Sequence, residues 1–274
     1  MSGLAPVRLP DGFQLVRYER LGSTNDEAKS RARAGAAEGT LVWAGEQTAG
    51  RGRRGRTWLS PPGNLYMSLV LRPSGSAASA AQLGFVAALG LGDAIADLAS
   101  PTLDLRYKWP NDLLANDRKL AGILLESETT ANDKVDFVVV GVGANLTSAP
   151  SGVEYPATSL AEQGYAGVTP PLLLQAFARH FDEWVQRWRF EGFAPVRAAW
   201  LSRASGIGET IRVRLERSIL FGRFHDLDND GALLLDTTEG RRRIAAGEVF
   251  PVEAADEPGV LRDAPRHDVG LRWH

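Results

Sequence analysis

The stretch Gly50-Arg51-Gly52-Arg53-Arg54-Gly55-Arg56 lies between two strand-like runs, residues 40–47 and 65–72. This segment, the arginine loop, places four guanidinium groups and three glycines in seven residues. Glycine allows close backbone approach, and arginine offers planar donors that match phosphate or carboxylate oxygens. A solvated basic loop and a nucleic-acid contact are the plainer interpretations, but the interleaved glycines and the flanking strands favour anion binding. We expect the loop to be mobile until an anion neutralises it.

Strand and helix patterns surround the arginine loop on both sides. Residues 13–18 alternate as a strand does, and Thr24 and Glu27 have the spacing of a capping box for a helix ending near Arg33. The run 137–142 is apolar throughout, as in a strand covered on both faces. Further strands are expected at 40–47, 65–72, 105–109, 113–115 and 120–127, with a turn at Asn116-Asp117, and helices at 78–99, 172–190 and 194–202.

The pattern changes after Gly206. Four short strand-like runs follow, at 211–215, 219–225, 232–236 and 241–245, with glycines near the turns, and they predict a small antiparallel barrel. We therefore expect a larger domain over residues 1–205, a barrel over 206–252 and a partly ordered tail over 253–274.

Composition excludes several classes of protein. The 274 residues carry 31 Lys plus Arg against 33 Asp plus Glu, so no overall field favours nucleic acid or anionic lipid. The chain has no cysteine, which excludes disulfides and thiolate sites and fits a cytoplasmic protein, and its four histidines are scattered. No secretory signal is visible, and the uncharged window 73–92 is interpreted as a buried helix, not a membrane span.

Three further motifs carry polar side chains at the ends of apolar runs. In Lys108-Trp109-Pro110-Asn111-Asp112, Pro110 fixes the backbone and presents two short polar side chains, although a plain Asx turn has the same pattern. Lys119, in the segment 118–122, precedes an apolar run that could hold its ammonium near a dry pocket, whereas a solvated strand end is the ordinary interpretation. The segment 141–146 lacks the third glycine and the following helix of a dinucleotide fingerprint.

Together these segments resemble the biotin protein ligases, also called biotin–[acetyl-CoA-carboxylase] ligases. The resemblance spans roughly 130 residues and continues more weakly in the C-terminal part. Its motifs are Ser23-Thr24-Asn25, Gln47-Thr48, Gly50 to Arg56 followed by Trp58, Lys108 to Asp112, Arg118 to Gly122 and Gly141 to Asn145. Some members carry an N-terminal DNA-binding domain, but the first strand here begins by about Phe13, so we expect the form without that domain, and no repressor function.

The resemblance implies an α+β fold, with a mixed β-sheet catalytic domain similar to class II aminoacyl-tRNA synthetases and a small C-terminal SH3-like barrel. It also implies two half-reactions. Biotin and ATP with Mg²⁺ give biotinyl-5′-AMP and pyrophosphate, and a lysine of a biotin carboxyl carrier protein domain then takes the biotinyl group. The implied protein is a cytoplasmic monomer or homodimer with no nucleic-acid or membrane partner.

By the same resemblance, site residues can be assigned. Lys119, between the biotin carboxylate and the α-phosphate, and Arg53 would be catalytic. The residues implied to bind biotin are Ser23, Thr24, Asn25, Gln47, Gly50, Arg51, Gly52, Arg53, Lys119 and Gly122. Those implied to bind ATP are Arg53, Arg54, Arg56, Trp58, Asn111, Lys119 and Asn145, with Mg²⁺ carried by the ATP phosphates.

The chemistry of the residues agrees with this assignment. A biotin carboxylate is ionised at pH 7, so its attack on phosphorus needs no general base, and the barrier is the repulsion between two anions. Three alternatives stay open from the sequence: a lipoate–protein ligase, a protein that binds nucleic acid through the arginine loop, and a biotin sensor without catalytic activity.

Overall fold

The computed structural model describes residues 7–130 and 134–252, so the expected tail over 253–274 lies outside the described residues. The described chain contains a seven-stranded sheet in the order β1-β2-β3-β7-β6-β5-β4. The strands are β1 (Gln14–Leu21), β2 (Thr40–Gln47), β3 (Leu65–Leu71), β4 (Leu105–Lys108), β5 (Asp112–Ala115), β6 (Arg118–Thr129) and β7 (Val135–Ala144). β1 and β2 run parallel and the other neighbours run antiparallel, so the sheet is mixed, as expected.

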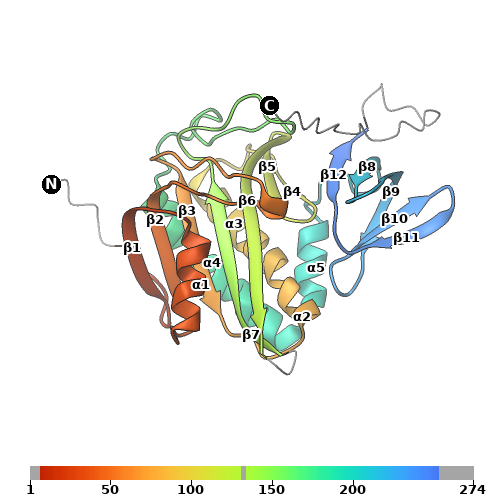
Figure 1. Cartoon of the computed structure of the whole chain (residues 1–274). Helices are drawn as coiled ribbons and strands as arrows, with labels where there is room; N and C mark the ends of the chain where they lie inside the picture. Colours follow the sequence, from red (N-terminus) through yellow and green to blue (C-terminus); the bar gives the residue numbers. More distant parts are fainter. Residues whose placement is uncertain (1–6, 131–133, 253–274) are drawn as a thin grey trace, which may run out of the picture.

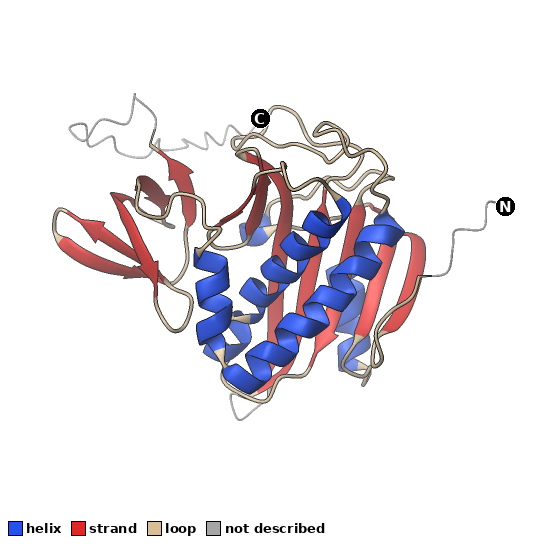
Figure 2. Cartoon of the chain, turned by 180° about the vertical axis from the view of Figure 1, so that it is seen from behind, coloured by secondary structure: helices blue, strands red, loops and turns tan. Residues whose placement is uncertain are grey.

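Helices cover both faces of this sheet (Figure 1). α1 (Thr24–Arg33) lies on one face, where Ala28 and Ala32 pack against Phe137 and Val139 of β7. α3 (Leu83–Leu98) and α4 (Pro170–Glu191) cross the other face, as Figure 2 shows from behind, and α5 (Phe193–Leu201) packs beside them. The alternate β7 residues, such as Val140, point into that second layer. The expectation that 137–142 is covered on both faces is confirmed.

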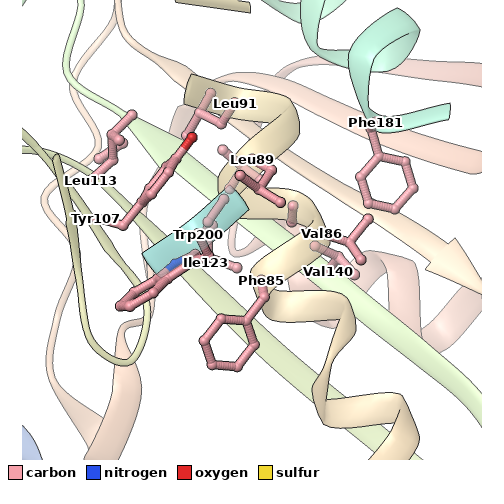
Figure 3. Packing of buried hydrophobic residues seen from close by; sticks show 14 of the residues in the cluster. Phe85, Val86, Leu89, Leu91, Tyr107, Leu113, Ile123, Val140, Phe181 and Trp200 are labelled. Atoms are coloured by element: carbon pink, nitrogen blue, oxygen red, sulfur yellow. The ribbon is translucent and has the colours of Figure 1, made fainter. Parts of the chain in front are cut away.

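The larger core combines aliphatic and aromatic side chains between the helices and the sheet (Figure 3). Phe85 of α3 packs edge-on against Trp200, with ring centroids 5.4 Å apart, and Trp200 stacks on Tyr107 of β4 at 5.9 Å. Such pairs add to the free energy gained by burying their large apolar surfaces. This packing fixes β4 and therefore the segment 108–112 that follows it.

The apolar stretch expected as one helix over 78–99 is divided at Gln82. α2 (Ala77–Ala81) ends there, and α3 begins at Leu83. The Gln82 amide accepts a hydrogen bond from Trp188 Nε1 at 2.8 Å and donates one to Asn229 O at 3.0 Å. By length and composition, Ala77–Leu98 could cross a membrane, but 72% of its apolar window is buried inside the protein, as in the core helix of a globular domain.

The start of α1 differs from the expected capping box. Ser23 is the N-cap residue, and no side chain caps the helix. The Thr24 hydroxyl donates to Gln47 Oε1 at 3.0 Å, and Glu27 Oε1 accepts from Tyr18 and Arg31. Both side chains of the expected capping box instead bond to other partners. Thr24 bonds to Gln47 of β2, and Glu27 bonds to Tyr18 of β1 and to Arg31.

The C-terminal part forms a five-stranded antiparallel sheet in the order β11-β10-β9-β8-β12, which lies beyond β4 in Figure 1. Its strands are β8 (Thr210–Arg214), β9 (Ile219–Leu227), β10 (Leu233–Thr237), β11 (Gly240–Ile244) and β12 (Glu248–Pro251). The sequence pattern did not predict β12, which has four residues and ends at a proline. β12 pairs with β8 and faces the larger sheet domain.

Polar contacts join the two parts of the molecule. Trp109 Nε1 donates to Gly231 O at 3.0 Å, and Arg197 Nε donates to Leu227 O at 2.7 Å. With the Gln82 contact, these bonds hold the turn between β9 and β10 against the larger domain. Trp109 lies next to Lys108 and Pro110, so the barrel contacts the motif expected in the active site.

Candidate active site

A cavity of about 380 Å³ lies between the arginine loop and the sheet. Its walls come from the arginine loop, from β5, β6 and β7, from the segment 150–157 and from β12. Most of the site residues expected from the sequence line it, namely Ser23, Thr24, Asn25, Gln47, Arg51, Gly52, Arg53, Arg56, Trp58, Asn111, Lys119, Gly122 and Asn145. The fold thus gathers residues that lie up to 122 positions apart in the chain.

One end of the cavity is neutral and polar. Gln47 Oε1 accepts from the Thr24 backbone N–H at 2.8 Å and from its hydroxyl at 3.0 Å, while Gln47 Nε2 donates to Ser60 at 2.9 Å. Beneath them, the fully buried Ser68 hydroxyl of β3 lies 2.6 Å from Asn25 Oδ1 and 2.8 Å from Thr24 Oγ1. This network orients hydroxyl and amide groups without any charge, which suits a neutral ligand rich in donors and acceptors.

Glycines form the floor of the cavity. Gly122 and Gly143 pair across β6 and β7, and the Trp58 indole lies on both of them. A Cβ on Gly143 would lie 2.6 Å from Trp58 Nε1, and one on Gly141 would lie 2.1 Å from Asn25 Oδ1. The glycines are therefore needed because a ring and an amide approach the backbone closely.

A buried carboxylate holds two lysines beside this floor. Asp112 pairs with Lys108 at 2.9 Å and with Lys119 at 2.6 Å. Burial raises the pKa of Asp112, but the two lysines outweigh that effect and lower it to about 2. The Lys119 ammonium also lies 5.4 Å from the centre of the Trp58 ring. The ion pair with Asp112 therefore holds the Lys119 ammonium in place at the cavity.

A β-bulge explains why Lys119 and Gly122 face the same cavity. Residues three positions apart in a regular strand point to opposite faces. The register between β5 and β6 shifts between Leu113 and Leu114, so that β6 has one extra residue next to Lys119. Bulges often redirect side chains at functional sites. The sequence pattern does not reveal this bulge.

Lys108 faces an aromatic wall that the barrel completes. Its ammonium lies 4.5 Å from the Tyr155 ring centre and 5.8 Å from that of Phe250 in β12. Burial raises the pKa of Tyr155 to about 12, so this phenol stays neutral at physiological pH. At this end of the cavity, a cation of the larger domain therefore lies against aromatic rings from both domains.

The arginine loop is held on both sides by acidic residues. Arg51 pairs with Asp26 at 3.0 Å and with Glu126, and Arg56 pairs with Glu248 of β12 at 2.6 Å. In the middle, Arg53 Nη1 donates to Asn111 Oδ1 at 3.3 Å and to Gly247 O at 3.4 Å. The expectation of a mobile loop was based on repulsion between its arginines. The paired acids offset this repulsion.

Two of the expected site residues, Gly50 and Arg54, do not line the cavity. Gly50 does not line the cavity, since an added Cβ would lie 2.3 Å from Trp58 O and 2.5 Å from Ser60 Oγ, and its role is close packing under the loop. Arg54 has a φ of 55°, and its exposed side chain is not part of the cavity lining. This arrangement gives the expected ligand contacts of Gly50 and Arg54 no support.

The two asparagines expected near the nucleotide serve the local structure as well. Asn111 Nδ2 donates to Ile123 O at 2.6 Å, which ties the segment 108–112 to β6. Asn145 is buried at the end of β7, and its Nδ2 donates to Thr158 O at 3.1 Å. Both still line the cavity, and the Asn111 oxygen meets the arginine loop.

Sequence reasoning missed several residues of the site: Ser68, Lys108, Asp112, Glu126, Tyr155, Glu248 and Phe250. Ser68 carried one available signal, since it is the one serine in the otherwise apolar and aromatic strand Leu65–Leu71. Lys108 and Asp112 stand in a motif that was recognised, but only the fold shows them paired with Lys119. Glu248 and Phe250 belong to β12, the strand that was not expected.

Comparison with known proteins gives the family of this chain. Residues 9–202 match the model of the Biotin/lipoate A/B protein ligase family, and residues 206–250 match that of the biotin protein ligase C terminal domain. The chain is 46% identical over 237 residues to a biotin–[acetyl-CoA-carboxylase] ligase of Paracoccus denitrificans, a match covering 84% of this chain and 98% of that protein.

A bifunctional ligase/repressor of Bacillus subtilis is 35% identical over 87% of this chain and 74% of its own length. Among solved structures, the biotin protein ligase from Aquifex aeolicus in complex with biotin and ATP superposes with a TM-score of 0.73 at 27% identity, covering 86% of this chain and 97% of that one. The expected fold is confirmed. Two matched domains, the 46% identical relative and this shared fold show that the chain belongs to the biotin protein ligases of the Biotin/lipoate A/B protein ligase family.

Proposed function

We propose that this biotin ligase uses ATP to convert biotin to biotinyl-5′-AMP and then transfers the biotinyl group to a lysine of a biotin carboxyl carrier protein domain. The observation that carries the proposal is the polarity of one cavity, which has a neutral hydrogen-bonding end at Thr24 and Gln47 and a cationic end at Lys119 and Arg53. The Paracoccus relative is named for the same acceptor, and the Aquifex structure holds biotin and ATP.

The two ends of the cavity match the two ends of biotin. In this proposal the ureido ring binds at Thr24 and Gln47, and the acyl chain lies along the glycine floor. The carboxylate then reaches Lys119, which faces the cavity from β6. ATP occupies the cationic side, between Arg53 and Asn111.

Charge stabilisation accounts for the first half-reaction. A carboxylate oxygen of biotin forms a bond to the α-phosphorus, and the bond from phosphorus to pyrophosphate breaks. Lys119 and Arg53 lower the barrier by offsetting the repulsion between the anions and the charge that develops in the transition state. Asp112 keeps Lys119 in place for this task. The arginine loop excludes water, which would otherwise hydrolyse the mixed anhydride.

The second half-reaction requires access for a lysine. Its neutral amine attacks the acyl carbon, the bond to the AMP oxygen breaks, and the amine nitrogen loses a proton. The described residues include no group of three or more His, Cys, Asp or Glu that could hold a metal ion. The proposal therefore has Mg²⁺ enter with the phosphates of ATP, a mode that this ion commonly uses.

DNA binding is not part of the proposed function. The Paracoccus relative, matched over 98% of its length, is named for ligation alone, whereas the bifunctional relative is matched over 74% of its length. The net charge of −2 gives no general attraction to a polyanion. Fluorescence anisotropy with duplex DNA should show no binding at physiological salt, and tight binding would contradict this part of the proposal.

The experiment that tests the proposal uses pure protein, radiolabelled biotin, ATP with Mg²⁺ and an apo carrier domain. We expect label on the carrier, dependent on ATP and absent when the acceptor lysine is replaced by arginine. A parallel reaction with lipoate serves as the matched control for substrate choice. Transfer of lipoate in preference to biotin, or no transfer of either acid, would overturn the proposal.

A further inference from the structure

Glu126 connects the polar end of the cavity to the arginine loop, although it does not itself line the cavity. Its Oε2 accepts a hydrogen bond from Asn25 Nδ2 at 2.8 Å and another from Arg51 Nη2. Its Oε1 accepts from Lys29 Nζ at 3.1 Å. One carboxylate of β6 therefore contacts α1 through two side chains and the arginine loop through a third.

The carboxylate fixes the orientation of the Asn25 amide. Asn25 Oδ1 lies 2.6 Å from the Ser68 hydroxyl, while Nδ2 donates to Glu126 and lies 3.4 Å from Leu124 O. If the amide were reversed, its nitrogen would face Ser68 and its oxygen would face a carboxylate. Glu126 thereby sets which atom Asn25 presents beside Thr24 and the cavity.

Glu126 is also the more buried of the two acids that hold Arg51. Its side chain is 26% exposed, against 52% for Asp26. Burial raises the pKa of Glu126, but hydrogen bonds from Asn25, Lys29 and Arg51 together hold the pKa below its ordinary value. The acid is thus charged at neutral pH and anchors the first arginine of the loop, which pairs with Thr57 where the loop closes.

We propose that Glu126 is a positioning residue that sets Asn25 and Arg51 together, so that an ordered biotin end and a closed arginine loop depend on the same carboxylate. This inference rests on the proposed function, because it assigns biotin to the Thr24 end of the cavity. Without the charge of Glu126, the Arg51 side chain keeps its ion pair with the exposed Asp26 of α1, but the loop loses its ion pair with β6.

The test is Glu126→Gln, which keeps the shape of the side chain and removes its charge. We expect the KM for biotin to rise roughly tenfold, while kcat for carrier biotinylation falls by less than about threefold, because ground-state positioning is lost and the reacting groups remain. Without carrier, free biotinyl-AMP in solution should increase several-fold. Glu128→Gln is the matched control, since Glu128 lies two residues further along β6 and pairs with Arg33 of α1, away from the loop.

A double-mutant cycle separates positioning from general stability. Arg51→Gln should raise the KM for biotin by itself, and adding Glu126→Gln to it should cost clearly less than in the native background. If Glu126→Gln no longer unfolds cooperatively, Arg51→Gln replaces it as the test variant, because the Arg51 side chain is exposed. The KM for biotin and the amount of free biotinyl-AMP are then measured in Arg51→Gln.

The outcomes distinguish this inference from the proposed function. If the native protein shows no biotin-dependent use of ATP, the proposed function fails and the inference fails with it. If the native protein is active and Glu126→Gln behaves like Glu128→Gln, the inference alone is overturned. Fully additive effects of the Glu126 and Arg51 substitutions would overturn it as well, because the two side chains would then act independently.

Discussion

At the scale of single residues, the charge of Lys119 dominates the proposed chemistry. Lys119 is held by Asp112 and by the face of the Trp58 ring, so its ammonium is directed before any substrate binds. Preorganised charge is effective in catalysis because it needs no rearrangement in the transition state. Arg53 adds a second cation, and its Nη1 donates to both Asn111 Oδ1 and the Gly247 carbonyl.

Lys119→Ala and Arg53→Ala should each slow adenylate formation by roughly 100-fold or more, since each removes a charge that offsets the repulsion between anions. Biotin-dependent exchange of pyrophosphate into ATP measures this step directly. Circular dichroism should show native folding in both variants. Exchange at the native rate in either variant would contradict the proposed role of that residue.

Asp112 should matter for stability as well as for positioning. Asp112→Asn leaves Lys108, only 7% exposed, without its counter-charge, and breaking one partner of a buried ion pair costs about 3–5 kcal/mol. Urea unfolding at pH 7 measures this loss. A loss below about 1 kcal/mol would show that the lysines find other partners.

The same residue predicts a dependence on pH. The folded-state pKa of Asp112 is lowered to about 2 from 3.8, so its charge stabilises the fold above about pH 4 and that contribution is lost as the pH falls toward 2. The difference in unfolding free energy between native protein and Asp112→Asn should therefore shrink over this interval. A difference that stays constant from pH 5 to pH 2.5 would contradict the assignment.

Residues near one another in the sequence were the ones that could be predicted. Arg53 stands in a motif whose composition indicates anion binding, whereas the role of Lys119 was predicted from the family resemblance of the segment 118–122. Glu126 was not predicted, because its partners Asn25 and Arg51 lie 101 and 75 residues away and nothing in its own segment marks it. Contacts between distant segments create such a site, and a local sequence pattern does not reveal these contacts.

At the scale of elements, the glycines of β6 and β7 set the depth of the cavity. Gly141 is the tightest of them, because an added Cβ would lie 2.1 Å from Asn25 Oδ1 inside a fully hydrogen-bonded cluster. Gly143 instead faces the Trp58 indole, a side chain at the cavity surface. A methyl group at these two positions should therefore have different effects.

Gly141→Ala should raise the Kd for biotin by roughly tenfold and lower stability by about 1–3 kcal/mol, since Asn25 must move and overpacking strains the core. Titration calorimetry with biotin and thermal unfolding measure the two effects. Gly84→Ala in α3 is the matched control, because its added Cβ meets no atom within 4 Å and a helical alanine is stabilising. Equal biotin affinity in both variants would show that Asn25 is not at the biotin end.

The elements themselves were largely predictable. β2 has the expected bounds, and the Asn116-Asp117 turn has positive φ at both residues, as a tight hairpin requires. The break at Gln82, the uncapped start of α1 and the bulge beside Lys119 were not predicted. Each depends on partners in distant elements, such as Trp188 and Asn229 for Gln82.

At the scale of the whole molecule, the barrel helps to build the active site. Its turn between β9 and β10 receives a hydrogen bond from Trp109, next to the cavity residues Lys108 and Pro110. Its last strand supplies Glu248 and Phe250 to the cavity wall. The family model matched to residues 206–250 thus corresponds to a part of the protein that contributes directly to the site.

Trp109→Phe should lower the free energy of unfolding by about 1–2 kcal/mol more than Trp43→Phe does. Both tryptophans are buried, but Trp109 Nε1 donates to Gly231 O, whereas Trp43 Nε1 has no hydrogen-bond partner within residues 7–130 and 134–252. Because both variants lose a similar ring volume, the difference between their unfolding free energies measures the hydrogen bond to the barrel. Equal losses in urea unfolding would show that this bond contributes nothing to docking.

The arginine loop is fastened on one side to α1 and β6, through Asp26 and Glu126, and on the other side to β12, through Glu248. Surface ion pairs weaken as ionic strength rises, because the Debye length falls from about 10 Å at 0.1 M to about 3 Å at 1 M. A high salt concentration therefore weakens the ion pairs on both sides of the arginine loop, while the apolar core remains stable. If the proposed function holds, we expect the protein in such a buffer to stay folded but to release its activated intermediate, so that ligation consumes extra ATP well before the protein denatures.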